Sequence, residues 1–497
     1  MRPCLVLFLA VLGPAACRGT PAPRPPAADP GPRVNVLLWF DTEDYILPAS
    51  DDAALRLAEF LSREGIRATF KVVGEKARVL ERRGRRDVIE ALSRHEIGYH
   101  TDFHSAQPTP AMYLSPLGWD EGVAEFERRE RRGFDDVVRI FGQHPGCYGQ
   151  PGGSWAPQAF GALRKWGVPV YLDDGGHVGL ENRPLYYGGL LTLYRLAQTV
   201  RTGLGGPQDL EAGKKRFDEA RRKLLAEGGG LVSVYYHPCE WVHREFWDGV
   251  NFSRGANPPR EKWQVPPQKT PEETRAAFET FEAWVRYMKT HPDVRFVTAR
   301  DALRIWRDKA RGRAFTKTEI REIAQAATGE AGFQRRGDCA LSAGEVFALL
   351  LDFVNGRAPD SVTLGDTPGG PADPVAALAS PVTTDWSQFS RTAADAAGYL
   401  RHRGRVPAAV WLGGTAVPPE AFLGALARVA LELLEGRTPE AVEVRPAGLA
   451  AAAHVSADGP HLWGWVVFPP GFRAPAMMEL AKRQAWTLKP ALLDRAD

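Results

Sequence analysis

Acidic side chains gather at the end of the apolar run at residues 34–40. Residues 40–44 read Phe-Asp-Thr-Glu-Asp and follow the apolar run at residues 34–40. Three carboxylates within four positions repel one another, so a bound cation or a proton-transfer role is expected to compensate for the repulsion. The alternative is that these residues cap the helix that follows.

Histidines follow two further strand-like runs. His100 and His104 stand in the sequence His-Thr-Asp-Phe-His, and this spacing predicts that both imidazoles lie on one side of a helical turn, as metal binding requires. His237 follows the run at residues 231–236 and is a candidate acid or base. Coincidental surface histidines, or a structural role for His237, are the alternatives.

These three groups together indicate one kind of chemistry. Two histidines and one carboxylate make a three-ligand site with an open position for water, the pattern of catalytic zinc. A second carboxylate can accept the proton of the water, and a separate histidine can protonate the leaving group. The sequence therefore predicts a hydrolytic metal site.

Alternating elements are expected to position these residues between about residue 33 and residue 311. Strand-helix alternation is typical of βα units and a parallel sheet, and six or seven such units suggest a closed barrel with its catalytic residues at the carboxyl ends of the strands. Strands are predicted at residues 34–40, 67–73, 96–100, 168–172, 231–236 and 294–297, and helices at 51–64, 75–95, 120–141, 157–166, 210–227 and 271–290.

The pattern changes after about residue 311, where alanine, glycine and proline become frequent and strand signals nearly vanish. A weak internal similarity predicts two copies of one helical unit, at about residues 316–362 and 387–442. Residues 367–374 are rich in glycine and proline and are expected to link the copies. We therefore predict a smaller, mainly helical, repeat-like module over residues 312–497.

Composition excludes several classes of function. The 497 residues allow about two to four domains. Lys and Arg number 63 and Asp and Glu 60, giving a formal net charge of +3, which argues against an electrostatically driven nucleic-acid binder. After the N-terminus no apolar run approaches the roughly 20 residues of a membrane span. Five cysteines are too few for a disulfide scaffold, and no disulfide is predicted.

The N-terminus has the pattern of an export signal. Arg2 precedes an apolar run at residues 4–12 and a small-residue site ending at Cys17, so residues 1–17 are predicted to be a signal peptide; a buried N-terminal element is the alternative. Cys17 resembles the lipidation site of bacterial lipoproteins, although Pro14 departs from that pattern. Residues 18–32 are predicted to be a proline-rich linker. We expect a secreted or periplasmic protein, or one anchored by lipid to the membrane surface.

The chain resembles the polysaccharide deacetylase family, the nodulation-type carbohydrate esterases, over about residues 33–300. The resemblance rests on Phe40–Asp44, His100–His104 and Val234–His237, in order and spacing, and on residues 68–74, which resemble the second strand of the family. It implies a deformed (β/α)7 barrel catalytic domain over residues 33–311. The implied activity is metal-dependent removal of acetyl groups from N-acetyl sugars.

The resemblance assigns roles to the residues of the first two motifs. Asp41 is implied to be the general base. Glu43 or Asp44 is implied to supply the metal carboxylate, with Glu43 favoured because several subgroups have Asp-x-acid. His100 and His104 complete the implied site, which would hold Zn²⁺ or another divalent transition metal such as Co²⁺ or Ni²⁺.

Two further positions complete the implied machinery. His237 is the implied general acid. Asp173 or Asp174, after the strand at residues 168–172, would orient or tune a catalytic group. Capping of a glycine-rich turn is the alternative for this pair.

The sequence departs from the family at its Arg-x-Pro-aromatic motif. Pro151 fits, but Gly149 replaces the arginine and Gly152 replaces the aromatic residue. The backbone N–H of Gly152 is still expected to point into an oxyanion hole, since that role needs only backbone. The lost arginine normally orients the base, so another cation, a different substrate or weak activity all remain open.

Aromatic residues near these motifs are expected to contact substrate. Trp155 and Trp241, with Pro151, are predicted to line the acetyl pocket or a sugar platform. Ordinary core packing is the alternative for both tryptophans.

The C-terminal region resembles the pseudomurein-binding repeat. The resemblance rests on Tyr399, Leu400 and residues 404–407, followed by residues 413–417 and 422–423. It implies a module that binds the cell wall or a glycan. A helical packing domain without a ligand is the alternative.

The sequence as a whole predicts an exported, metal-dependent hydrolase whose partner is an N-acetylated polysaccharide or cell-wall glycan, with no nucleic-acid partner. One alternative is a non-catalytic glycan-binding protein with a degenerate esterase barrel. Another is a hydrolase of other non-peptide amides on the same barrel. The polymer, the metal and the oligomeric state stay open.

Overall fold

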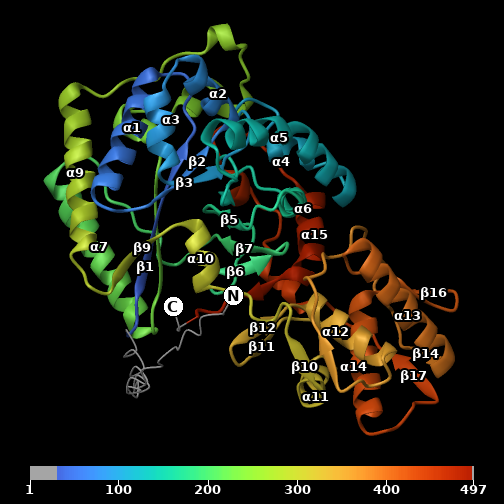
Figure 1. Cartoon of the computed structure of the whole chain (residues 1–497). Helices are drawn as coiled ribbons and strands as arrows, with labels where there is room; N and C mark the ends of the chain where they lie inside the picture. Colours follow the sequence, from blue (N-terminus) through green and yellow to red (C-terminus); the bar gives the residue numbers. More distant parts are fainter. Residues whose placement is uncertain (1–30, 495–497) are drawn as a thin grey trace, which may run out of the picture.

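A curved ten-stranded sheet organises the first two thirds of the computed structural model, which describes residues 31–494 (Figure 1). The strands follow the order β18-β6-β7-β5-β4-β3-β2-β1-β8, and β9 also pairs with β1. They are β1 Val34–Thr42, β2 Thr69–Val72, β3 Glu96–Tyr99, β4 Cys147–Tyr148, β5 Val170–Leu172, β6 Leu185–Tyr187, β7 Leu190–Leu193, β8 Gly230–Tyr236, β9 Val294–Val297 and β18 Lys489–Pro490.

Strand β1 is the central element. All nine of its residues are buried, as expected for a continuous apolar run covered on both faces. It pairs in parallel with β2, β8 and β9. Because parallel strands end at the same edge of a sheet, the acidic residues at the end of β1 lie at the same edge as the ends of β3 and β8.

Helices connect these strands and lie on the outside of the sheet (Figure 1). They begin and end with local signals, such as the capping box of Thr270 and Glu273 at the start of α9 and the left-handed Gly142 after α5. They are α1 Pro48–Arg63, α2 Gly74–Arg82, α3 Arg86–Ser93, α4 Pro110–Leu114, α5 Trp119–Phe141, α6 Pro157–Lys165, α7 Pro207–Ala226, α8 Trp247–Phe252, α9 Pro271–Lys289 and α10 Ala299–Ile305.

The predicted α/β architecture is confirmed in its coarse form, but the closed parallel barrel is wrong in two respects. The sheet is mixed, because β6 runs antiparallel to both β7 and β18. A tight turn at Gly188 and Gly189, both with positive φ, joins β6 to β7 and leaves no room for a crossover helix. The second departure is on the other side of the sheet. There β8 pairs with the segment after β7 only through an isolated β-bridge between Thr199 and Ser233.

Residues 314–444 form two successive stretches with the same order of elements, each being strand, helix, hairpin, helix, strand. In each stretch the outer strands pair with one another. The first comprises β10 Ala314–Thr316, α11 Lys317–Ala326, β11 Gln334–Arg336, β12 Cys339–Leu341, α12 Ala343–Asn355 and β13 Ser361–Thr363. The second comprises β14 Val382–Asp385, α13 Trp386–Arg403, β15 Val410–Leu412, β16 Thr415–Val417, α14 Pro419–Leu434 and β17 Ala441–Val444.

The expectation of a mainly helical region needs correction, because four two-stranded sheets accompany these four helices. Each of the strands has only three or four residues, too few to show a period of two in the sequence. The domain boundaries drawn from the sequence stay predictions.

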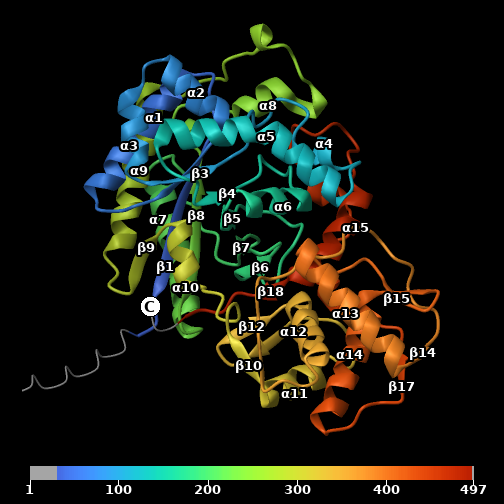
Figure 2. The same cartoon turned by 45° about the vertical axis from the view of Figure 1, so that its right-hand side comes forward.

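After β17 the chain returns to the barrel (Figure 2). Helix α15, Pro475–Gln484, leads to β18, which pairs with β6. Trp463 and Phe468 of this returning segment join the main hydrophobic core. Buried Lys489 of β18 forms ion pairs with Glu345 of α12 and with Asp308, and so ties the C-terminal region to the sheet.

The predicted signal peptide and linker, including Cys17, lie outside the described residues, apart from the last two linker positions. Among the residues that the structure describes, no helix combines the length and the apolar character of a membrane span.

Candidate metal centre

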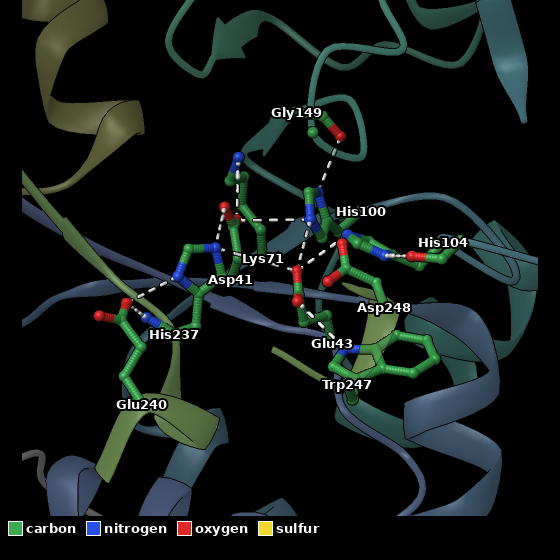
Figure 3. A network of polar contacts seen from close by, with 12 residues as sticks. Asp41, Glu43, Lys71, His100, His104, Gly149, His237, Glu240, Trp247 and Asp248 are labelled. Atoms are coloured by element: carbon green, nitrogen blue, oxygen red, sulfur yellow. Dashed lines mark hydrogen bonds and ion pairs between the residues drawn. The ribbon is translucent and has the colours of Figure 1, made fainter. Parts of the chain in front are cut away.

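The carboxylate of Glu43 lies at the centre of a buried polar cluster beyond the end of β1 (Figure 3). Its Oε2 atom is 2.8 Å from His104 Nε2 and 3.5 Å from His100 Nε2. Its Oε1 atom accepts a hydrogen bond of 3.1 Å from the indole Nε1 of Trp247. One oxygen is thus held by the protein, while the other faces both imidazoles.

The two histidines come from a curled loop after β3, not from the helical turn that their spacing predicted. Thr101 and His104 have φ values of 64° and 55°, in the left-handed region. The hydroxyl of Thr101 accepts a hydrogen bond of 3.2 Å from the backbone N–H of His104. Such conformations are costly for residues other than glycine, and they cluster at functional sites where the surroundings hold them in place.

Outer hydrogen bonds fix how the imidazoles are presented. His100 Nδ1 donates to the carbonyl of Gly149 at 3.0 Å, and His104 Nδ1 lies 2.6 Å from the hydroxyl of Ser105. Both Nε2 atoms therefore point toward Glu43, the arrangement that ligating histidines adopt. Neither buried Nε2 atom has a hydrogen-bond partner among the described residues.

These observations fit a bound cation. A buried polar atom without a partner is costly, and a metal ion would satisfy both nitrogens at once. Glu43, His100 and His104 offer three ligand atoms that all lie within 4.8 Å of one another. Two imidazoles and a carboxylate suit Zn²⁺, Co²⁺ or Ni²⁺, so the donor set does not choose among these metals. We call these three residues the ligand side of the site.

The charge states of His100 and Glu43 suit a metal. Burial lowers the pKa of His100 and favours the neutral imidazole, with Asp41 acting in the opposite direction. Burial would raise the pKa of Glu43, but His104 and His237 outweigh it, so the pKa lies well below its usual value. Neutral imidazole and ionised carboxylate are the forms that bind metals.

A second group, which we call the base side, consists of Asp41, Lys71 and Asp173. Lys71 Nζ lies 3.0 Å from Asp41 Oδ1 and 2.6 Å from Asp173 Oδ2, and it donates to the carbonyl of Leu172 at 2.9 Å. Asp41 Oδ1 is also 3.8 Å from His100 Nε2, so the two sides adjoin.

The two carboxylates of the base side differ in acidity. Burial would raise the pKa of Asp41, but the proximity of His100 and of the Lys71 ammonium outweighs it and the pKa is lowered. Burial raises the pKa of Asp173 to about 7, because Lys71 offsets only part of the desolvation. Asp41 is therefore the carboxylate that is ionised near neutral pH.

His237 completes the cluster from the end of β8. Its Nε2 atom lies 3.7 Å from Asp41 Oδ2 and 3.9 Å from Glu43 Oε2, while its Nδ1 atom is 2.8 Å from Glu240 Oε1. Burial alone would lower the pKa of His237, but Glu43 and Glu240 raise it to about 9. Its side chain is 16% exposed, more than those of Asp41 and Glu43, so the cluster opens to solvent on this side.

Asp44 is not brought to the ligand side, which corrects the alternative assignment of the metal carboxylate. Its Oδ1 atom accepts from the backbone N–H of Ile46 at 2.8 Å, and its Oδ2 atom lies 3.6 Å from His243 Nε2. Asp44 thus organises the turn before α1, close to the capping role that the sequence offered as an alternative. Asp174 forms no part of the base side, because only Asp173 reaches Lys71.

The predicted substrate contacts at Trp155 and Trp241 are wrong. Both side chains are fully buried. Trp155 stacks on His177 at a centroid distance of 5.0 Å, and Trp241 packs edge-on against Phe281 at 5.1 Å. Both tryptophans are core residues. Pro151 is buried as well and presents no surface to a substrate.

Gly152 is exposed and lies against a residue from the far end of the chain. A side-chain carbon at this glycine would overlap the indole ring of Trp465. That ring also lies edge-on to His104, with centroids 5.6 Å apart, and its Nε1 atom donates to Asp248 at 2.9 Å. The returning segment thus brings an aromatic side chain to the metal centre.

Sequence reasoning missed four residues of the site: Lys71, Glu240, Trp247 and Asp248. Only one of them carries a signal in the sequence. Lys71 is the sole charge in the otherwise uncharged strand β2, whose four residues are all buried. A charged residue in a strand of that kind must find a partner, and this could have marked it. The others lie in loops and short helices without a periodic pattern.

No protein-family model and no curated protein matches this chain. Several solved structures are similar at low sequence identity. One is a Mycobacterium smegmatis protein assigned as a polysaccharide deacetylase, at 15% identity and a TM-score of 0.34, covering 58% of this chain and 91% of that one. An allantoinase is similar at 14% identity and a TM-score of 0.34, covering 59% and 98%.

A third similar structure is a CE4 family pseudoenzyme from Bacillus anthracis, at 12% identity and a TM-score of 0.28, covering 54% of this chain and 65% of that one. Similarity this distant says nothing of the reaction, which must be argued from the site itself. The C-terminal region has no matching family model either, so its likeness to the pseudomurein-binding repeat rests on the sequence alone.

Proposed function

We propose that the protein is a metal-dependent hydrolase of carbon–nitrogen bonds that removes acetyl groups from an amino-sugar polysaccharide. One observation carries the proposal. Glu43, His100 and His104 form a buried donor set with two unpartnered imidazole nitrogens, and Asp41 and His237 adjoin it. A donor set, a base and an acid on one face are the parts that metal-assisted amide hydrolysis needs.

A bound divalent metal supplies polarisation of the acetyl carbonyl and lowers the pKa of a water molecule. Asp41 accepts the proton of the attacking water, because it is the ionised carboxylate nearest to the donor set. His237 gives a proton to the leaving nitrogen from Nε2, while Glu240 holds the Nδ1 proton. The exposed backbone of Gly152 is the candidate for the oxyanion contact.

Two aromatic side chains take the place of the buried tryptophans as candidate substrate contacts. Phe246 is 38% exposed and lies edge-on to His237 at a centroid distance of 4.8 Å. Trp465 is half-buried beside His104. Aromatic faces on both flanks of the site suit a sugar ring. Trp465→Ala is expected to raise KM for an oligosaccharide about tenfold with little change in kcat, measured by initial rates over a range of substrate concentrations.

Export and glycan anchoring belong to the same proposal. The pattern of residues 1–17 supports passage out of the cytoplasm, with Cys17 as the site of a lipid anchor. A polymeric substrate outside the cell accords with such a signal. The duplicated elements of residues 314–444 are proposed to bind the cell wall or a glycan.

The deciding experiment measures metal content and acetate release together, on protein lacking residues 1–30. Elemental analysis is expected to find about one divalent metal per chain, and N-acetylglucosamine oligomers are expected to release acetate. A His100→Ala/His104→Ala variant loses both. His243→Gln is the matched control, since it changes a buried histidine outside the donor set and is expected to keep both.

The outcomes separate the readings of the chain. Metal binding without acetate release would contradict the acetylated sugar as substrate and favour another non-peptide amide. Absence of bound metal from the parent protein would contradict the hydrolase and favour a protein that only binds glycan.

A further inference from the structure

We propose that Lys71 is the positioning residue for the base Asp41, a built-in cation that fills the space left by the absence of a side chain at Gly149. The inference rests on the proposed function, in which Asp41 accepts a proton, and it assigns a role to a residue that no part of that mechanism has used.

The ammonium of Lys71 is enclosed and paired with two carboxylates. Its side chain is completely buried in β2, where a lysine is rare unless it is paired. Nζ donates hydrogen bonds to Asp173 Oδ2 at 2.6 Å and to the carbonyl of Leu172 at 2.9 Å, and it forms an ion pair with Asp41 Oδ1 at 3.0 Å. The indole of Trp39 adds a cation–π contact, with Nζ 4.3 Å from the ring centroid.

Gly149 and Lys71 depend on each other. A side-chain carbon at Gly149 would overlap both Lys71 Nζ and Asp173 Oδ2, and it would lie 2.6 Å from the carbonyl oxygen of Leu172. The position after β4 can therefore hold no side chain while the ammonium is in place. The cation beside Asp41 is therefore Lys71 of β2. Position 149 is a glycine and places only backbone atoms in this space.

This arrangement fixes which oxygen of Asp41 is free. Oδ1 is taken by the ammonium, whereas Oδ2 faces His237 Nε2 at 3.7 Å. The backbone of Gly149 also reaches the ligand side, since its carbonyl accepts from His100 Nδ1. Lys71 thus fixes the orientation of Asp41 relative to the donor set. It does so beside Gly149, whose backbone contacts His100 on the ligand side.

The ammonium also explains a second cluster of possible ligand atoms. Asp41, His100 and Asp173 could by their spacing hold another metal ion. Lys71 Nζ already forms ion pairs with both of these carboxylates. We therefore assign this second cluster to the lysine, and one metal per chain to the site.

A paired substitution tests the role by removing the ammonium together with the carboxyl group that it bonds apart from Asp41. Lys71→Met/Asp173→Asn keeps both side chains close in shape to the originals and leaves Asp41 without its cation. We expect kcat to fall about a hundredfold, the lower range for a general base, with KM changed less than threefold and one metal still bound per chain. Lys71→Arg, which keeps the charge, is expected to recover at least a tenth of the parent kcat.

The matched control removes a buried ion pair elsewhere. Lys489→Met/Glu345→Gln deletes a lysine and a carboxylate that are equally buried, in β18 and α12. It is expected to lower the melting temperature as the test variant does and to leave kcat within twofold of the parent. A test variant with kcat within threefold of the parent would overturn the inference.

A spectroscopic readout separates this inference from the proposed function. In protein labelled with ¹⁵N-lysine and freed of metal, the bonded ammonium of Lys71 is expected to give a ¹H–¹⁵N signal that Lys71→Met removes and Asp41→Asn shifts. That signal needs no turnover. An inactive parent with a shifting signal contradicts only the acetyl substrate, whereas a signal indifferent to Asp41→Asn contradicts the role of Lys71.

Discussion

The ligand side and the base side adjoin, yet they are completed in opposite ways. On the ligand side, two buried imidazole nitrogens have no hydrogen-bond partner among the described residues. On the base side, the lysine ammonium forms ion pairs with both carboxylates and supplies the positive charge from within the chain. One side thus needs a cation from solution, and the other contains one. The difference predicts that metal removal disables the first and leaves the second intact.

The largest expected effect comes from breaking the ligand side. Glu43→Gln keeps the shape of the side chain but removes the charge that faces both imidazoles. The Lewis-acid contribution of a metal is several kcal/mol, so activity is expected to fall roughly a thousandfold, with bound metal lost in elemental analysis. Asp44→Asn is the neighbouring control and is expected to keep the metal. Retention of metal by Glu43→Gln would contradict the ligand assignment.

The ligand side was also the part of the site that the sequence could predict. Glu43, His100 and His104 lie in two short segments that follow β1 and β3, and parallel strands end at the same edge of a sheet, so the strand pattern and the spacing were enough to place them together. The predicted helical turn at the histidines was wrong, because it takes the left-handed φ of Thr101 and His104 to aim the rings, and spacing carries no information on φ.

The base side could be predicted only in part. Asp41 and Asp173 were expected from the sequence, but the cation between them was not. Lys71, Gly149 and Asp173 come from segments about 25 to 80 residues apart, and only the sheet order β5-β4-β3-β2 brings them together. Trp465 is more remote still, since it depends on the returning segment. Burial decided the errors at Trp155 and Trp241, which fill the core behind the strand ends instead of the surface in front of them.

His237 links the two sides, and its removal is expected to have the next largest effect. His237→Asn takes away the imidazolium that protonates the leaving nitrogen, so kcat is expected to fall about a hundredfold while the metal stays bound. In the parent, kcat is expected to decline at alkaline pH as His237 loses its proton. That decline should be absent from the pH–rate profile of the variant. If kcat of His237→Asn declines at alkaline pH as the parent does, the decline belongs to a group other than His237.

A smaller effect is expected from the outer partner of the ligand side. Trp247→Phe keeps the aromatic packing but removes the indole N–H that holds Glu43 Oε1. Outer partners of ligating groups typically contribute 10–100-fold to metal affinity, and a loss in that range is expected by competition with a chelator. Trp465→Phe removes an indole donor that points to Asp248 instead, and it serves as the matched control. Equal losses in the two variants would show that Trp247 acts through packing alone.

The smallest effect concerns a histidine that has burial without carboxylates, in contrast to His237. His177 is stacked on Trp155, and burial lowers its pKa to about 3, whereas Glu43 and Glu240 raise that of His237 to about 9. The unfolded chain binds a proton at His177 near pH 6.5 and the folded protein does not, so stability falls as the pH drops from 6.5 toward 3. Between pH 6.5 and pH 5 the loss is about 2 kcal/mol.

His177→Gln removes this titration, and its free energy of unfolding is expected to fall less steeply below pH 6.5 than that of the parent. Urea unfolding at pH 7 and at pH 5 measures the difference for both proteins. The substitution also costs packing energy, but that loss is the same at both pH values. It therefore cancels when the free energies of unfolding at pH 7 and pH 5 are subtracted within each protein. Parallel pH dependences in parent and variant would mean that His177 takes up a proton within the fold. In that case burial would not explain why the pKa of His177 differs from that of His237.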